Sequence, residues 1–266
     1  MIVADALKAL EALEAREARL LLAKATGCSE ASVLAHPEQR LAADAEARFL
    51  EFAARRTRGE PVAYILGEKE FFGLRLSVNA AVLIPRPETE LLVELALAAR
   101  PASLLDLGTG SGAIALALKR HLPEARVVAV DERAAALEVA RRNAAQLALA
   151  VEFRQGRWFE PVAGERSDLI VSNPPYVAEV DPHLAQGDLM FEPRHALVAG
   201  ADGLEAIREI ARLAAHHLNA SGWLLVEQGL GQDAAVRSLL QAAGFAEVRS
   251  WPDLSGIARV SGGRLK

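Results

Sequence analysis

A glycine-rich turn between an apolar strand and a helix constrains this chain more than any other feature of its sequence. In LLDLGTGSGAIALAL, three glycines follow an apolar run: Gly108, Gly110 and Gly112, with Thr109 and Ser111 between them. Glycine lets a backbone turn tightly and approach a ligand without a Cβ clash, and the following helix offers unpaired N–H groups. The turn therefore predicts a ligand-binding loop at the end of a strand.

The ligand that suits this loop contains adenosine. Gly108, Gly110 and Ala113 satisfy the dinucleotide fingerprint, and Asp131 closes the next predicted strand, where an acid that binds ribose is expected. The fingerprint alone leaves both NAD and S-adenosylmethionine open. Asp106, at the end of the strand before the loop, would repel a pyrophosphate but can help to hold an amino-acid cofactor, which favours S-adenosylmethionine.

Predicted strands and helices alternate beyond residue 100 and indicate an α/β fold. Strands are expected at 103–107, 126–130, 151–155, 168–172, 222–228, 245–251 and 256–261, and helices at 112–121, 133–147, 203–219 and 232–243. This alternation predicts a mostly parallel, Rossmann-like sheet with helices on both faces and ligands at the carboxyl ends of its strands. Only PDLSG joins the last two strands, so we expect them to pair antiparallel, unlike a purely parallel dinucleotide-binding sheet.

The first part of the chain has a different pattern. Leu7, Leu10 and Leu13 recur at helical spacing, without the alternation of a strand, and predict a small helical domain. Bulky and polar residues then alternate around Asn79 in FFGLRLSVNAAVLI, which predicts a β-hairpin that links two domains. The predicted boundaries of the helical domain, the hairpin linker and the ligand-binding domain are 1–68, 69–86 and 87–266.

Charge and composition argue against several classes of function. The 266 residues carry a net charge of -5, which disfavours a large nucleic-acid footprint, and no apolar run approaches the ~20 residues of a membrane span. The N-terminus lacks the layout of a signal peptide, and a single cysteine fits a reducing compartment, so we expect a cytoplasmic protein. No metal site is expected, because the histidines lack ligand spacing and suit solvated or capping roles: His121, His183, His195, His216 and His217.

A basic cluster marks the end of the predicted helical domain. It consists of Arg55, Arg56 and Arg58, directly before Gly59 and Pro61. Cations near a helix C-terminus are stabilised by the helix dipole, so the cluster fits a solvated helix end as well as a patch that docks a partner.

The strand predicted at 168–172 ends in the unusual tetrapeptide NPPY. Pro174 and Pro175 remove two N–H donors and fix φ, which leaves backbone carbonyls free beside the Asn173 amide. The Asn173 oxygen and the Pro174 carbonyl can each accept one proton from a substrate NH2 group, while Tyr176 can pack on its planar surface. The motif therefore predicts a site that makes a conjugated nitrogen nucleophilic; a strand-ending turn is the structural alternative.

These motifs together resemble a known group of enzymes. NPPY after DLGTGSG resembles amino-methyltransferases that act on planar nitrogens. The strings PVAYILGEKEFFG, LIPRPETE, NPPYV and FEPRHAL, in this order from Pro61 to Arg264, resemble the bacterial release-factor glutamine methyltransferases. The resemblance implies methylation, from S-adenosylmethionine, of the glutamine N5 in the Gly-Gly-Gln motif of class 1 peptide-chain release factors, which would be the protein partner.

The resemblance also implies roles for individual residues. Residues 108–112 would cradle the methionine part of the cofactor, Asp131 would bind the ribose hydroxyls and Trp158 would lie against the adenine. Arg157 stands in QGRWFEP where relatives often carry an acid, which removes an acid contact with the adenine amino group. The glutamine amide would be held by the NPPY residues, with Asn173 beside both cofactor and substrate: Asn173, Pro174, Pro175 and Tyr176.

Three further residues of the shared strings, Arg86, Glu90 and Glu192, are expected to shape the pocket, by contact or by a structural role. Other readings of the chain stay open at this point. The same chemistry suits a ribosomal-protein glutamine or a nucleic-acid adenine, although the acidic total and the lack of a basic target-recognition region disfavour DNA. A nicotinamide-dependent oxidoreductase would fit the glycine fingerprint but would leave the NPPY motif unexplained. A catalytically inactive adapter protein that acts through the helical domain would bind no cofactor.

Overall fold

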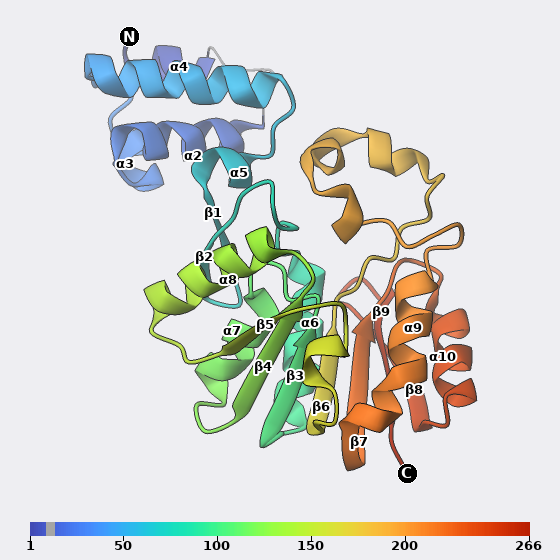
Figure 1. The fold of residues 1–266 in the computed structure, drawn as a ribbon. Coiled ribbons are helices and arrows are strands. Elements are labelled where there is room, and N and C mark those ends of the chain that lie inside the picture. Colours follow the sequence, from blue (N-terminus) through green and yellow to red (C-terminus); the bar gives the residue numbers. More distant parts are fainter. Residues whose placement is uncertain (9–13) are drawn as a thin grey trace. The chain divides into compact units, whose positions relative to one another are not determined.

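The computed structural model describes residues 1–8 and 14–266, so Leu10 and Leu13 of the predicted helical pattern lie outside the described residues. The chain forms two compact units (Figure 1). One comprises Met1–Glu68 and Ala185–Phe191, and the other comprises Lys69–Leu184 and Glu192–Lys266. We call them the helical unit and the sheet unit. None of the helices within the described ranges is long and apolar enough to cross a membrane.

The helical unit is built around a small apolar core. Its helices are α1 (Val3–Lys8), α2 (Ala15–Thr26), α3 (Glu30–Ala35), α4 (Ala43–Thr57) and α5 (Val62–Leu66). Leu21 and Leu22 of α2 and Phe49 of α4 are fully buried and pack together with residues of the other helices. Burial of these amphipathic faces stabilises helices that are too short to be stable alone.

Ion pairs inside the helical unit engage two arginines of the basic cluster. Arg55 pairs with Glu60 at 2.6 Å, and Arg56 pairs with Glu17 of α2 at 2.9 Å. Arg56 also pairs with Asp188 at 3.1 Å and thereby ties the inserted segment 185–191 to α4. Arg55 and Arg56 thus serve the cohesion of this unit, which neither of the two readings of the cluster anticipated.

The hairpin is shorter than the sequence pattern predicts. Its strands are β1 (Glu68–Phe71) and β2 (Leu74–Ser77), and it turns at Phe72 and Gly73, both with positive φ, as a type I′ hairpin turn requires. The alternating pattern around Asn79 continues past the second strand, where the Asn79 side-chain oxygen accepts the Ala81 N–H at 2.9 Å and bends the chain locally.

A seven-stranded sheet forms the centre of the sheet unit. Its strands lie in the order β5-β4-β3-β6-β7-β9-β8 (Figure 1). They are β3 (Ser103–Leu107), β4 (Arg126–Asp131), β5 (Glu152–Gln155), β6 (Ser167–Ser172), β7 (Leu218–Glu227), β8 (Ala246–Pro252) and β9 (Ala258–Arg264). The pairs from β5 to β7 are parallel, and β9 runs antiparallel to both β7 and β8, which confirms the predicted fold class.

Two apolar cores cover the faces of this sheet. The helices are α6 (Glu90–Ala98), α7 (Ala113–His121), α8 (Ala134–Leu147), α9 (Glu205–Ala214) and α10 (Asp233–Ala242). Residues of α6 and α7 pack with alternate strand residues on one face, and those of α9 and α10 pack on the other. Since the hairpin contributes Phe71, Leu74 and Leu76 to the first of these cores, it is part of the sheet unit's packing.

The order of the strands determines where a ligand can bind. From β3 the chain first moves outward to β4 and β5, and then returns to place β6 on the other side of β3. Such a switch point opens a crevice at the carboxyl ends of the two strands. The glycine-rich loop follows β3 and Asn173 follows β6, so both lie at this crevice.

One buried amide fastens the glycine-rich loop to its surroundings. Asn143 of α8 is fully buried, and its oxygen accepts the Ser77 N–H at 2.7 Å. Its NH2 group donates to the carbonyls of Ser77 at 3.0 Å and Ser111 at 2.9 Å. A single side chain therefore connects α8, the hairpin and the loop, with every hydrogen-bonding position of the amide used except one lone pair.

We expect Asn143→Ala to destabilise the sheet unit by about 2–4 kcal/mol, because it leaves the half-buried Ser77 backbone groups and the buried Ser111 carbonyl without this partner. Urea unfolding followed by tryptophan fluorescence measures this, since Trp158, Trp223 and Trp251 all lie in the sheet unit. The control is Asn219→Ala, which removes one hydrogen bond, to Asp168, and should cost about 1 kcal/mol. Equal losses in both variants would contradict the fastening role.

Candidate active site

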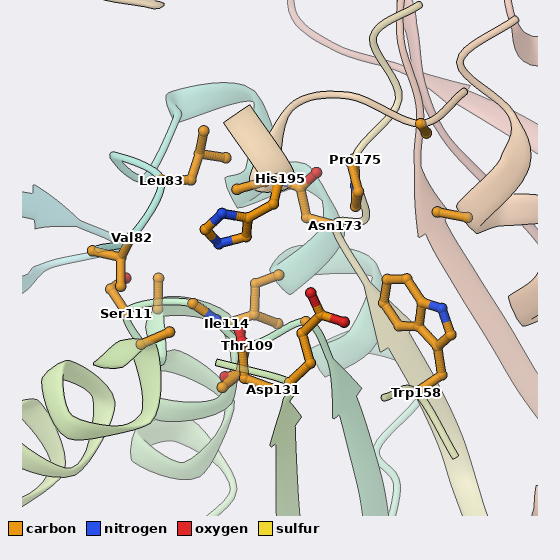
Figure 2. A pocket seen from close by; sticks show the side chains of 18 of the residues that line it. Val82, Leu83, Thr109, Ser111, Ile114, Asp131, Trp158, Asn173, Pro175 and His195 are labelled. Carbon is orange, nitrogen blue, oxygen red and sulfur yellow. Dashed lines mark hydrogen bonds between the residues drawn. The ribbon is translucent and has the colours of Figure 1, made fainter. Parts of the chain in front are cut away.

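A cavity of about 300 Å³ lies at the carboxyl ends of the strands (Figure 2). Its lining comes from the loop before α6, the glycine-rich loop, the ends of β4 and β5, the end of β6 and the segment before α9. It includes eight of the eleven predicted site residues: Gly108, Thr109, Gly110, Ser111, Asp131, Trp158, Asn173 and Pro175. Gly112, Pro174 and Tyr176 are not part of the lining.

Two glycines of the loop have different tasks. A Cβ on Gly108 would lie 3.4 Å from the Trp158 ring, so this glycine brings the backbone close to the indole. A Cβ on Gly112 would lie 3.1 Å from Leu116 Cδ1 and 3.2 Å from the Ala140 Cβ, and both glycines have positive φ. Gly112 therefore allows α7 and α8 to pack closely beneath the loop, and its predicted contact with a cofactor stays a prediction.

Asp131 presents a carboxylate to the cavity from the end of β4. One of its oxygens accepts the Gly110 N–H and the other accepts the Arg133 N–H, each at 2.9 Å. Burial raises the pKa of this carboxyl, and the two backbone donors partly offset the effect. Figure 2 shows the carboxylate pointing into the cavity beneath His195, where it can accept hydrogen bonds from vicinal hydroxyls.

Trp158 is fixed on the opposite wall of the cavity. Its backbone has φ 45°, and its indole N–H donates to Glu209 of α9 at 3.2 Å. Arg157, which stands at the position often acidic in relatives, pairs with the same Glu209 carboxylate. The arginine thus neutralises the acid that holds the tryptophan, and the flat ring is left as an apolar wall for a planar base.

The polar groups of the cavity fit S-adenosylmethionine better than a dinucleotide. The lining contains the carboxylates of Asp131, Glu132 and Glu205, and its Arg157 guanidinium is already paired. A pyrophosphate would meet uncompensated negative charge there, whereas a cationic amino-acid cofactor would be attracted. The glycine backbone, the Asp131 carboxylate and the apolar surface of Trp158 suit the methionyl, ribose and adenine parts.

Asn173 is held by its neighbour Thr89. The Asn173 NH2 group donates to the Thr89 hydroxyl at 3.1 Å, and Asn173 lines the cavity with no hydrogen bond to its amide oxygen within the described residues. Pro175 lines the cavity and Pro174 is buried. The predicted contact of the Pro174 carbonyl with a substrate amide stays a prediction.

Tyr176 lies behind the cavity wall. Its ring packs with the apolar core on the α9 and α10 face, its hydroxyl donates to Glu227 at 3.3 Å, and its carbonyl accepts from Gln232 at 3.0 Å. Burial raises the pKa of Tyr176, and the Glu227 charge adds to this. In this arrangement the phenol secures the loop after β6; its predicted packing on a substrate stays a prediction.

The three pocket-shaping residues have structural partners. Glu192 is buried, accepts the Ile84 N–H at 3.1 Å and pairs with Arg86, which joins the IPR and FEP strings. Glu90 accepts the Phe72 N–H at 3.0 Å and holds the hairpin turn. Of the two roles considered for each residue, contact with a ligand or a structural role, these partners support the structural role.

Several residues of the site escaped the sequence reasoning. His195, expected to be solvated, lines the cavity together with Glu205 (Figure 2 shows His195). The Val177 N–H donates to the Leu197 carbonyl at 2.8 Å, and this pairing brings the segment of His195 beside the NPPY loop. Thr89 and Glu227 are also new. A glutamate after the apolar run GWLLV was a signal that could have found Glu227.

Two buried acids carry a strongly raised pKa. Burial raises the pKa of Asp106 to about 7, although the Thr109 hydroxyl donates to it at 2.6 Å. Burial likewise raises the pKa of Glu227 to about 7. One oxygen of each carboxyl lacks a hydrogen-bond partner within the described parts of the chain, so the charged form is poorly compensated.

We expect the free energy of unfolding to fall as pH rises from about 5 to about 8. The folded state keeps protons on Asp106 and Glu227 that the unfolded state releases near pH 4, so the stabilisation present below that pH is lost as pH passes 7. Asp106→Asn and Glu227→Gln should each flatten the dependence by about 2–4 kcal/mol. Urea unfolding across pH measures this; an unchanged slope in both would contradict it. The exposed Glu124→Gln is the control.

Comparison with known proteins places the chain in a family. Residues 87–203 match the model of the methyltransferase small domain, and residues 3–67 match that of the PrmC N-terminal domain. The release factor glutamine methyltransferase of Xylella fastidiosa (strain Temecula1) is 50% identical over 92% of this chain and 90% of the relative. That of Burkholderia pseudomallei is 50% identical over 93% and 90%, respectively.

Solved structures share the fold at lower identity. A methyltransferase from Pyrococcus furiosus has a TM-score of 0.58 at 19% identity and covers 79% of this chain and 96% of its own. The T. Thermophilus 16S rRNA N2 G1207 methyltransferase, solved with AdoMet and guanosine, has a TM-score of 0.54 at 20% identity, over 75% and 50%. The half-identical relatives and their extent are decisive: this chain belongs to the family of release factor glutamine methyltransferases.

Proposed function

We propose that this protein transfers a methyl group from S-adenosylmethionine to the side-chain N5 of the glutamine in the Gly-Gly-Gln motif of class 1 release factors. The family supports the substrate. The observation that carries the chemistry is the Asn173 amide, which lines the cavity, has its NH2 group engaged by Thr89 and has no partner for its oxygen among the described residues. This is the arrangement that an incoming NH2 group needs.

The cofactor would lie along the strand ends. The backbone of residues 108–111 would hold the methionyl part, Asp131 the ribose hydroxyls and Trp158 the adenine, as their places in the cavity allow. When bound, S-adenosylmethionine supplies a methyl group made electrophilic by its sulfonium. Gly112 is assigned to the packing of α7 and α8 under the loop.

The residues after β6 would prepare the substrate nitrogen. The lone pair of an amide nitrogen is delocalised, so it is a poor nucleophile until the nitrogen becomes tetrahedral. Acceptors at the Asn173 oxygen and the Pro174 carbonyl would take one N–H each, favour that shape and stabilise the positive charge that develops on nitrogen. With the cofactor bound, the nitrogen lone pair would form the new N–C bond while the methyl–sulfur bond breaks, its electron pair returning to sulfur to leave a neutral thioether. One N–H proton would then leave to solvent, so no base is required before transfer.

The partner is a protein, and the helical unit would recognise it. With a net charge of -5, and with Arg55 and Arg56 paired inside the unit, we propose no stable binding of nucleic acid. The reaction would take place in the cytoplasm, where release factors act.

Incubation with labelled S-adenosylmethionine and a purified class 1 release factor should place one methyl group on the Gly-Gly-Gln glutamine, located by peptide mapping. The control is a release factor in which that glutamine is replaced by alanine, which should stay unlabelled. Label on nucleic acid and none on the glutamine would show that the substrate is a different planar nitrogen.

We expect Asn173→Ala to lower kcat by about 100-fold or more, because it removes an acceptor that acts on developing charge. Binding of S-adenosylmethionine, measured by calorimetry, should stay within about 3-fold of wild type, since glycine loop and Asp131 are intact. Ser238→Ala in α10, whose hydroxyl donates only to its own helix, is the control. Undiminished turnover of Asn173→Ala would contradict the proposed role of the Asn173 oxygen as an acceptor for the substrate NH2 group.

A further inference from the structure

A small, largely buried polar cluster lies beside Asn173, and its member Thr89 also lines the cavity. Thr89 is 3% exposed and Glu227 is 1% exposed. They come from distant parts of the sequence: Thr89 ends the short helix Pro87–Thr89 before α6, and Glu227 ends β7. The Asn173 NH2 group donates to Thr89, and the Tyr176 hydroxyl donates to Glu227. Thr89 also hydrogen-bonds the Glu227 carboxyl and thereby lowers its pKa against the larger effect of burial.

The cluster bears on a choice that an asparagine side chain always has. A half-turn about its last bond exchanges the oxygen and the NH2 group, which have nearly the same shape but opposite hydrogen-bonding roles. With its oxygen toward the cavity, Asn173 accepts a proton from a substrate NH2 group. With its NH2 group toward the cavity, Asn173 would place a donor opposite the donors of the substrate NH2 group and repel the substrate.

The hydroxyl of Thr89 resolves this choice. A threonine hydroxyl has one proton and two lone pairs. Where Glu227 takes that proton, Thr89 can only accept from Asn173, and only the NH2 end of the amide can donate. The flipped amide would place oxygen against oxygen in a buried site, which costs a lost hydrogen bond and a repulsion.

We propose that Thr89, backed by Glu227, is a positioning residue that selects the catalytic rotamer of Asn173, with the amide oxygen facing the substrate nitrogen. The inference rests on the proposed function for its consequence in catalysis and on the geometry of the cluster for the rotamer itself. Thr89 acts through Asn173 and has no part in the chemical step.

Glu227 fits the role of acceptor for the Thr89 proton because it is a carboxyl group. Its burial costs free energy, which indicates that the position serves more than packing. Glu88 and Arg259 also act on it, with opposite effects on its pKa, and its second oxygen lacks a partner within the described residues. Burial raises its pKa to about 7, so above this pH it is an acceptor only. An apolar residue there would avoid the penalty of burial but would leave the Thr89 proton free to point at Asn173.

The test compares Thr89→Val, which keeps the shape but removes the hydroxyl, with Thr89→Ser, which keeps the hydroxyl. We expect Thr89→Val to lower kcat about 10- to 100-fold, with KM for the release factor and the Kd of S-adenosylmethionine within about 3-fold of wild type. Thr89→Ser should restore most of kcat. Thr89→Ala, which adds no methyl group beside the amide, should behave like Thr89→Val and serves if the valine variant does not fold.

A second readout does not depend on activity. The side-chain NH2 resonances of Asn173 in the full chain, assigned by their absence in Asn173→Ala, report the hydrogen bond to Thr89. They should move to the position of an unbonded amide in Thr89→Val and stay in place in Thr89→Ser.

Three results would overturn the proposal: a kcat of Thr89→Val within about 3-fold of wild type, a serine variant as defective as the valine variant, or unmoved Asn173 resonances. If the wild-type protein methylates no release factor, the proposed function fails by that result alone. The resonances then decide the rotamer: displacement in Thr89→Val only supports its selection by Thr89, and no displacement refutes it.

Discussion

The pairing of β3 with β6 is the constraint on which the rest of the site depends. Leu107 and Ser172 lie opposite each other as the last residues of the two parallel strands, and the Ser172 hydroxyl donates to the Leu107 carbonyl at 2.7 Å. The next residues are Gly108 on one strand and Asn173 on the other. The register therefore brings the glycine-rich loop and Asn173 to the same edge of the sheet.

Around this pair, the site is organised by the direction of hydrogen bonds. Asp131 and Glu227 each end a strand as buried acceptors, and each uses up donors of its neighbours: backbone N–H groups in one case, hydroxyls in the other. The prolines after Asn173 remove two more donors. In the proposed function, Asn173 and Pro174 would therefore offer two acceptors to the substrate, which would suit an NH2 group better than a carbonyl or a phosphate.

The sequence predicted most of the sheet because its strands are apolar runs with clear ends. Asp106, Asp131 and Asn173 could be placed at strand ends because the first two follow an apolar run directly and Asn173 follows one after a single serine. The pattern failed where tertiary contacts override it. The helix expected over 203–219 ends at Ala214, because Leu218 already pairs with Ser167 in the sheet and Ser221 adopts a positive φ.

The sequence could not reveal which residues meet from different elements. Thr89 reaches Asn173 across 84 positions, and Tyr176 reaches Glu227 across 51. His195 comes to the cavity because its segment pairs with Val177, which no local periodicity encodes. Conversely, the NPPY motif by itself predicts that Tyr176 packs on a substrate. In the structure, its hydroxyl is bonded to Glu227 and its carbonyl to Gln232.

Because of the segment 185–191, the helical unit is not the one continuous stretch of the chain that the sequence suggests. This segment follows the NPPY loop along the chain but is anchored in the helical unit, by Asp188 on Arg56 and by the Phe191 ring, 3.2 Å from where a Cβ on Gly59 would lie. Cutting the chain at residue 68 would therefore not yield two whole parts. The helical unit is completed by residues borrowed from the middle of the enzyme, so insertions, shuffling or transplantation of either part must carry this segment along.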